Sequence, residues 1–166
     1  MQWKNHRITT CAVTYALTGS FPATAIATAS SMLPDVLEMK LLKHRTMTHY
    51  PWIFLIPIVL MWSAMQHSPG YTLYTVFFIF FGYLCHLAED FMSKSGIPLV
   101  SPFGEPTGLG LYVTHAPSEF RVALIIVALA VAYSWHNGLL TQDYLMHAAN
   151  NMAILVMGVG KTITHR

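Results

Sequence analysis

Charged side chains are scarce in this chain of 166 residues, where Asp, Glu, Lys and Arg together supply only 10% of the sequence. A soluble domain usually carries about 25% charged residues. Hydrophobic residues make up 54% of the chain, and the mean hydropathy is +0.48. This deficit of charge argues against an ordinary soluble domain and indicates that a lipid bilayer surrounds much of the chain.

Cysteine and net charge are also low, and each excludes a class of function. The two cysteines, Cys11 and Cys85, lie inside apolar segments, so we expect no structural disulfide. The net charge of +2 is too weak to indicate nucleic-acid binding. The sequence also has no Gly-rich phosphate loop, nucleophile elbow, zinc-ribbon cysteine pair or convincing cleavable signal peptide. Histidine, with nine copies, is the first indication of chemistry.

Long apolar stretches dominate the sequence, and no repeat divides it, so we treat residues 1–166 as one domain. The stretches cover about residues 8–33, 52–66, 71–88, 121–136 and 144–160. A transmembrane helix needs ~20 residues. The first stretch contains Gly19-Ser20-Phe21-Pro22 at its centre, which favours a break followed by a new helix. We therefore predict an all-α integral membrane protein with about four transmembrane helices and an N-terminal helical hairpin.

The placement of basic residues favours the hairpin. With a hairpin and four spans, all nine Lys and Arg residues fall on one side of the membrane. The loops at about 66–70 and 137–143 on the other side have none. The positive-inside rule then places the basic side in the cytoplasm. If the first stretch crossed the membrane instead, Lys4 and Arg7 would lie alone on the far side.

His86 and Asp90 form the sharpest candidate pair. They lie four residues apart at the end of the third apolar stretch, so a helix places both side chains on one face, one turn apart. Such a pair can share a metal ion, or the carboxylate can orient the imidazole. Gly82, one turn earlier, allows another helix to approach closely. A histidine near the lipid headgroups with a solvated Asp90 is the structural alternative.

Further candidates lie on the same side of the predicted topology. His44 and His49 belong to a loop that can fold both imidazoles onto one ion, although both could also be solvated. Asp35 follows a proline at the end of the hairpin and returns toward His6, although Pro-Asp is also a common turn pair. Glu119 opens the fourth stretch, where capping of the helix N-terminus is the alternative explanation.

Taken together, these segments resemble the YdjM-like family, bacterial inner-membrane proteins regarded as metal-dependent hydrolases. Its pattern has an early His, a Pro-Asp element, His-Arg-x-x-Thr-His, and Gly-Tyr-x-x-His-x-x-x-Asp followed by Gly and Pro. The matching segments are His6, Pro34-Asp35, His44-Arg45-Thr46-Met47-Thr48-His49, Gly82-Tyr83-Leu84-Cys85-His86-Leu87-Ala88-Glu89-Asp90 and Gly96-Ile97-Pro98. The family often has a second Asp two residues after the first, whereas this sequence has Glu38 three residues after it.

The resemblance implies a metal site and a class of reaction. The expected ligands are His6, Asp35, His44, His49, His86 and Asp90. The expected metal is Zn²⁺. Because six ligands are more than one tetrahedral site needs, more than one ion could bind. The family is also distantly similar to zinc-dependent phospholipase C and related nucleases, which implies phosphoester hydrolysis. A site at headgroup depth makes a membrane lipid or a lipid-linked phosphoester the expected substrate.

Four residues receive expected catalytic or substrate-binding roles. Asp35 or Glu119 could take the proton from the attacking water, and Arg45 or Arg121 could hold a phosphate oxygen. The expected location is the bacterial inner membrane, with the site facing the cytoplasm.

Two non-hydrolase readings stay open. In one, the protein is a membrane adaptor whose metal site is closed and only holds loops in place. In the other, it is a small transporter, which predicts polar groups that continue through the membrane, such as His147, Asn150 and Asn151.

Overall fold

The computed structural model describes residues 1–41, 47–68 and 70–164, and most of these residues are helical. Its elements are α1 (Trp3–Thr18), α2 (Phe21–Ser30), α3 (Leu33–Leu41), a 3-10 turn η1 (Met47–His49), α4 (Trp52–His67), α5 (Tyr71–Met92), β1 (Ile97–Pro98), β2 (Pro106–Thr107), α6 (Pro117–His136) and α7 (Gln142–Thr164). The antiparallel β1–β2 ribbon is the one sheet among the described residues, and it lies within the connection between α5 and α6.

The first apolar stretch folds as the predicted hairpin of α1 and α2. Helix α1 ends at Gly19, whose φ of 59° is left-handed and whose N–H donates to the Tyr15 carbonyl. Ser20 then caps α2 by accepting a hydrogen bond from the Ala23 N–H, and Pro22 lies in the first turn. The short Gly-Ser-Phe-Pro segment therefore ends one helix and starts the next.

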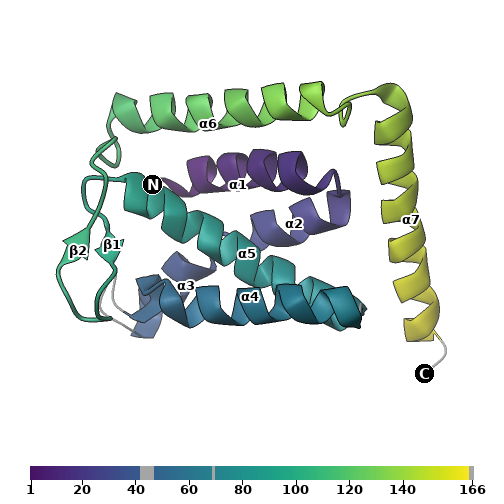
Figure 1. Cartoon of the computed structure of the whole chain (residues 1–166), viewed down its shortest axis with the longest axis horizontal. Coiled ribbons are helices and arrows are strands. Elements are labelled where there is room, and N and C mark those ends of the chain that lie inside the picture. The colour runs from purple at the N-terminus through teal and green to yellow at the C-terminus, as the bar shows by residue number, and fades with distance from the viewer. Residues whose placement is uncertain (42–46, 69, 165–166) are drawn as a thin grey trace.

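Two helices in the described part of the chain, α5 with 22 residues and α6 with 20, are long and apolar enough to cross a membrane. The predicted count of four spans is therefore not confirmed. Helix α4 is apolar but has only 16 residues, a rise of roughly 24 Å against the ~30 Å of a hydrocarbon core. Helix α7 exposes His147, Asn150 and Asn151 and lies across the ends of α1 and α2 (Figure 1).

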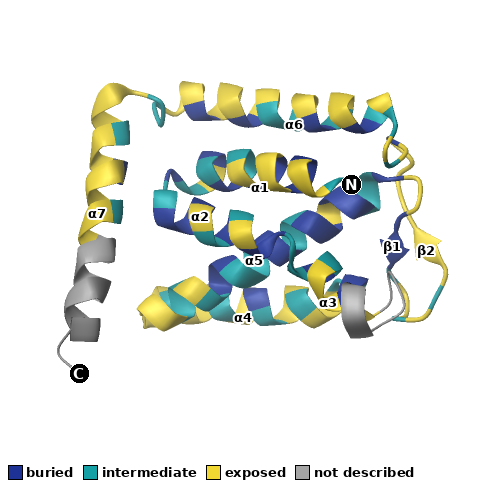
Figure 2. Cartoon of the chain, turned by 180° about the vertical axis from the view of Figure 1, so that it is seen from behind, coloured by how far each residue is buried: buried dark blue, intermediate teal, exposed yellow. Residues whose placement is uncertain are grey.

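Packing centres on α5, which runs between the hairpin and α4 (Figure 1). One apolar cluster joins Ala23 and Ala27 of α2 to Ile58 of α4 and Phe77 and Phe78 of α5. Helix α6 packs along α1, and its outer face is exposed (Figure 2). That exposed face is largely apolar, which suits contact with lipid; it includes Phe120, Leu124, Ile125, Leu129, Val131 and Tyr133.

The two ends of the molecule differ in chemistry. At one end the start of α1 reaches the start of α6, where the Gln2 N–H donates to Glu119. The end of α5 and the β1–β2 ribbon lie at this same end (Figure 1). At the other end, the Tyr15 hydroxyl donates to the Leu139 carbonyl at 2.7 Å. We call the first of these the site end, because it holds the polar cluster that follows.

Candidate metal centre

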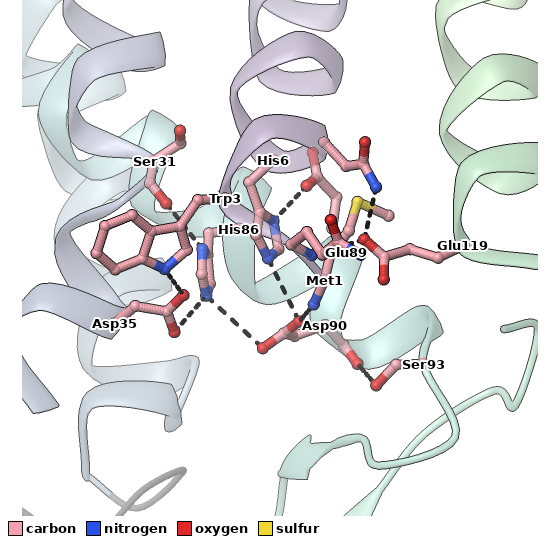
Figure 3. A network of polar contacts seen from close by, with 12 residues as sticks. Met1, Trp3, His6, Ser31, Asp35, His86, Glu89, Asp90, Ser93 and Glu119 are labelled. Carbon is pink, nitrogen blue, oxygen red and sulfur yellow. Dashed lines mark hydrogen bonds and ion pairs between the residues drawn. The ribbon is translucent and has the colours of Figure 1, made fainter. Parts of the chain in front are cut away.

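Five titratable residues from four elements meet at the site end. They are His6 of α1, Asp35 of α3, His49 of η1, and His86 and Asp90 of α5. The three histidines are at most 1% exposed, and the Asp90 side chain is 2% exposed. We call this group the five-residue cluster; Figure 3 shows four of its members.

The Nε2 atoms of all three imidazoles face the two carboxylates. His86 Nε2 lies 3.5 Å from Asp35 Oδ1 and 3.6 Å from Asp90 Oδ2. His6 Nε2 lies 3.5 Å from Asp90 Oδ1, and His49 Nε2 lies 3.4 Å from Asp90 Oδ2. These separations are long for hydrogen bonds. They match the roughly 3.3–3.6 Å between two ligands that each lie about 2.0–2.2 Å from one tetrahedral metal ion.

Two of these nitrogens lack a hydrogen-bond partner among the described residues, and this lack fits a metal site. His6 Nε2 and His86 Nε2 are buried and have no hydrogen-bond partner within the described ranges. Buried polar atoms nearly always have a partner, and an exception calls for a cause such as an ion. Imidazole nitrogens and carboxylate oxygens are also the donor set that Zn²⁺ prefers among residues of these types. The residues present therefore fit a divalent metal ion.

The opposite nitrogen of each ring has an acceptor that fixes its orientation. His6 Nδ1 lies 2.5 Å from Glu89 Oε2, and His49 Nδ1 lies 2.7 Å from Glu38 Oε1. His86 Nδ1 lies 2.8 Å from the Ser31 carbonyl oxygen (Figure 3). With the proton held on Nδ1, Nε2 presents its lone pair to the centre of the cluster, as it does in carboxylate–histidine–metal sites.

The electrostatics of the cluster attract a cation. Burial alone would raise the pKa of Asp35, but the combined effect of the nearby His86 and His6 imidazoles outweighs it and holds the pKa below its usual value. Burial alone would lower the pKa of His6, but the carboxylates of Asp90 and Glu89 outweigh it and raise the pKa. The Met1 amino group lies 2.6 Å from Asp90 Oδ1, so this carboxylate already holds one cation (Figure 3).

Asp35 lies at the opening of the cluster. Its side chain is 16% exposed, against 2% for Asp90, so it is the more accessible of the two carboxylates. The Trp3 indole N–H donates to Asp35 Oδ2 at 2.8 Å, which fixes the carboxylate so that Oδ1 faces His86 (Figure 3). A water or substrate therefore meets Asp35 before it meets Asp90.

A sequence profile of the YdjM inner membrane protein family matches residues 1–163. The chain belongs to this family. The match covers the whole five-residue cluster and agrees with the apolar helices α5 and α6. No curated protein and no solved structure gives a significant match.

In this YdjM-family chain, five of the six predicted metal ligands come together. The sixth, His44, lies outside the described residues, as does Arg45. Arg121 is exposed near the start of α6, in its second turn. Glu119 accepts hydrogen bonds from the Gln2 N–H, the Asn5 side-chain amide and the His115 N–H. Glu119 Oε1 thus holds the start of α1 against α6, while Oε2 accepts from the connection just before α6, and we assign Glu119 a positioning role.

Glu89 and Glu38 were missing from the predicted site of this YdjM-family protein. Glu89 is 5% exposed and accepts a further hydrogen bond from the Thr9 hydroxyl at 2.5 Å. Glu38 is 7% exposed and accepts from the Thr48 hydroxyl. Their burial is the decisive signal, because buried carboxylates need partners. Sequence alone offered only the proximity of Glu89 to Asp90 and the altered acid spacing at Glu38.

Replacing Glu89 by Gln should weaken metal binding without removing a ligand. Glu89→Gln removes the charge that holds His6 Nδ1, and loss of such a partner typically lowers metal affinity about 10–100-fold. A Zn²⁺ competition titration with a chromophoric chelator measures the change. Glu105→Gln, at an exposed position, is the matched control. Equal affinity of the two variants would show that Glu89 does not orient a metal ligand.

Proposed function

We propose that this protein is a membrane-bound, metal-dependent hydrolase that acts on a phosphoester at the membrane interface. The observation that supports the proposal is the convergence of three buried imidazole Nε2 atoms on the carboxylates of Asp35 and Asp90. The Nδ1 atom of each imidazole lies within hydrogen-bond distance of an acceptor oxygen. An arrangement of this kind is typical of catalytic and structural zinc sites.

The proposed ligands can be grouped into more than one metal position. Potential ligand atoms lie within 4.8 Å of one another in three sets: His6, Asp35 and His86; His49, His86 and Asp90; and Asp35, Glu38 and His49. The sets share members, which supports a proposal of two neighbouring Zn²⁺ ions rather than one. A divalent ion bound here would supply Lewis acidity and bring the pKa of a bound water toward ~7.

We assign Asp35 as the proton acceptor for the attacking water. Its position at the opening places it where water arrives, and the Trp3 indole fixes one of its oxygens. An Asp carboxylate is ionised at neutral pH, so it can accept a proton. Asp90 is too deeply buried for this task and instead balances the charge of the site. Glu119, the other predicted base, already accepts hydrogen bonds from three donors.

The proposed substrate is a membrane lipid or a lipid-linked phosphoester. The cluster lies at the end of α5 and near the start of α6, and the ends of membrane spans lie at headgroup depth. Arg121, and Arg45 outside the described residues, are the cations proposed to hold phosphoryl oxygens. The basic residues favour the cytoplasmic face of the inner membrane as the location of this end.

Turnover of a phosphoester panel by the purified metal-loaded protein tests the proposal. Asp35→Asn should lower turnover by roughly 10²–10⁴-fold, the usual contribution of a general base. Asp143→Asn, exposed on α7, should match the wild type. Bound metal without turnover of any lipid or nucleotide phosphoester would favour the membrane adaptor with a structural metal site. Wild-type turnover by Asp35→Asn would overturn the assignment of Asp35 as the base.

A further inference from the structure

A groove of about 520 Å³ runs along the outer side of the hairpin, away from the five-residue cluster. Its lining comes from one face of α1 and from one residue of α2: Lys4, Arg7, Ile8, Cys11, Ala12 and Thr28. The α1 residues recur at intervals of three and four, so they follow one helix face.

The chemistry of the groove changes along α1. Lys4 and Arg7 lie in the first two turns, at the site end, and both are exposed. Ile8 and Cys11 follow and are also exposed, and Cys11 lies roughly 10 Å further along the axis than Lys4. Helix α1 packs along α6, which is long and apolar enough to cross a membrane, and with α6 as a span this direction leads from the interface into the hydrocarbon. The groove is therefore cationic at the site end and apolar further along α1.

The two cations at the mouth are available to a ligand. Neither Lys4 nor Arg7 takes part in an ion pair within residues 1–41, 47–68 and 70–164. The opposite face of α1 packs against the protein interior, because His6, Thr9 and Thr14 are buried there. The exposed face thus has no ion-pair partner in the described structure and is free to contact lipid.

We propose that this groove binds one anionic phospholipid, with its phosphate on Lys4 and Arg7 and an acyl chain along Ile8, Cys11 and Ala12. Juxtamembrane basic residues attract anionic lipids. A soluble anion would leave the apolar length of the groove empty, and a zwitterionic lipid brings its own cation. The proposal rests on the groove and does not require the metal.

Photocrosslinking of the full chain in lipid nanodiscs tests this site. The probe is a phosphatidylglycerol that carries a diazirine on its acyl chain, and peptide mapping locates the crosslinks. We expect labelling between Ile8 and Ala12. The double variant Lys4→Gln/Arg7→Gln should lower it on the order of twentyfold, because each basic residue near the surface contributes about fivefold. Crosslinks to the exposed face of α6 report bulk lipid and should not change.

Matched variants and probes decide whether the groove is specific. Lys94→Gln removes an exposed charge that does not line the groove and should leave the labelling unchanged. The conservative pair Lys4→Arg/Arg7→Lys should retain it, and Zn²⁺ content measured in parallel reports the metal centre separately. Equal labelling by a phosphatidylcholine probe, or an equal loss in Lys94→Gln, would overturn the proposal. Displacement by inorganic phosphate at constant ionic strength would also overturn it and identify a small-anion site.

Discussion

Asp90→Asn protein should bind Zn²⁺ more than about a hundredfold more weakly than the wild type, a larger effect than the loss of a supporting residue. The two Asp90 oxygens face the Nε2 atoms of His6, His49 and His86, so Asp90 is shared by all three imidazoles. Asparagine keeps the shape of the side chain but removes the negative charge and one anionic oxygen. The remaining imidazoles would then hold a dication with only Asp35 to balance its charge.

Metal analysis after dialysis against buffers of graded free Zn²⁺ measures this loss. A second readout is thermal unfolding, because a ligand that binds the native state stabilises it. A chelator should lower the unfolding temperature of the wild type and leave that of Asp90→Asn unchanged. Asp143→Asn, exposed on α7, is the control for loss of one acidic charge and should behave as the wild type. A wild-type Zn²⁺ affinity in Asp90→Asn would exclude the five-residue cluster as the metal centre.

The parts of the fold that depend on neighbouring residues were predictable. The break between α1 and α2 follows from Gly19 and Pro22, whose backbone preferences act within one turn. The pairing of His86 with Asp90 follows from the period of the helix, and both face the same point in the structure. In each case the sequence separation is small, so local geometry determines the result.

The parts that depend on distant contacts were not predictable. Glu89 lies next to Asp90 in the chain, yet its partners His6 and Thr9 are on α1, 83 and 80 residues away. Glu119 looked like a helix cap or a base, but its role is set by Gln2 and Asn5, more than a hundred residues away. The predicted number of spans stays unconfirmed for a related reason. Hydropathy does not determine whether α7 runs alongside α6 or across the ends of α1 and α2.

Gly82→Ala should lower the free energy of unfolding by about 3 kcal/mol, because one methyl group would enter a contact between two backbones. A Cβ at Gly82 would lie 2.1 Å from the Ala27 carbonyl oxygen and 2.3 Å from the Ser30 hydroxyl. The carbonyl belongs to α2 and cannot rotate away, so α2 must move from α5. Small residues at such interfaces are what allow membrane helices to approach closely.

This displacement should also reach the metal centre. Ser31, directly after α2, holds His86 Nδ1 at 2.8 Å, and His86 lies one turn beyond Gly82 on α5. If α2 moves, His86 loses the acceptor that orients it, and Zn²⁺ affinity should fall along with stability. Gly70→Ala is the matched control, since a Cβ there has no atom within 4 Å and the φ of −154° suits any residue. Unfolding in detergent micelles and a Zn²⁺ titration should separate the two variants. Equal stability of both would mean that α2 and α5 are not in contact at Gly82.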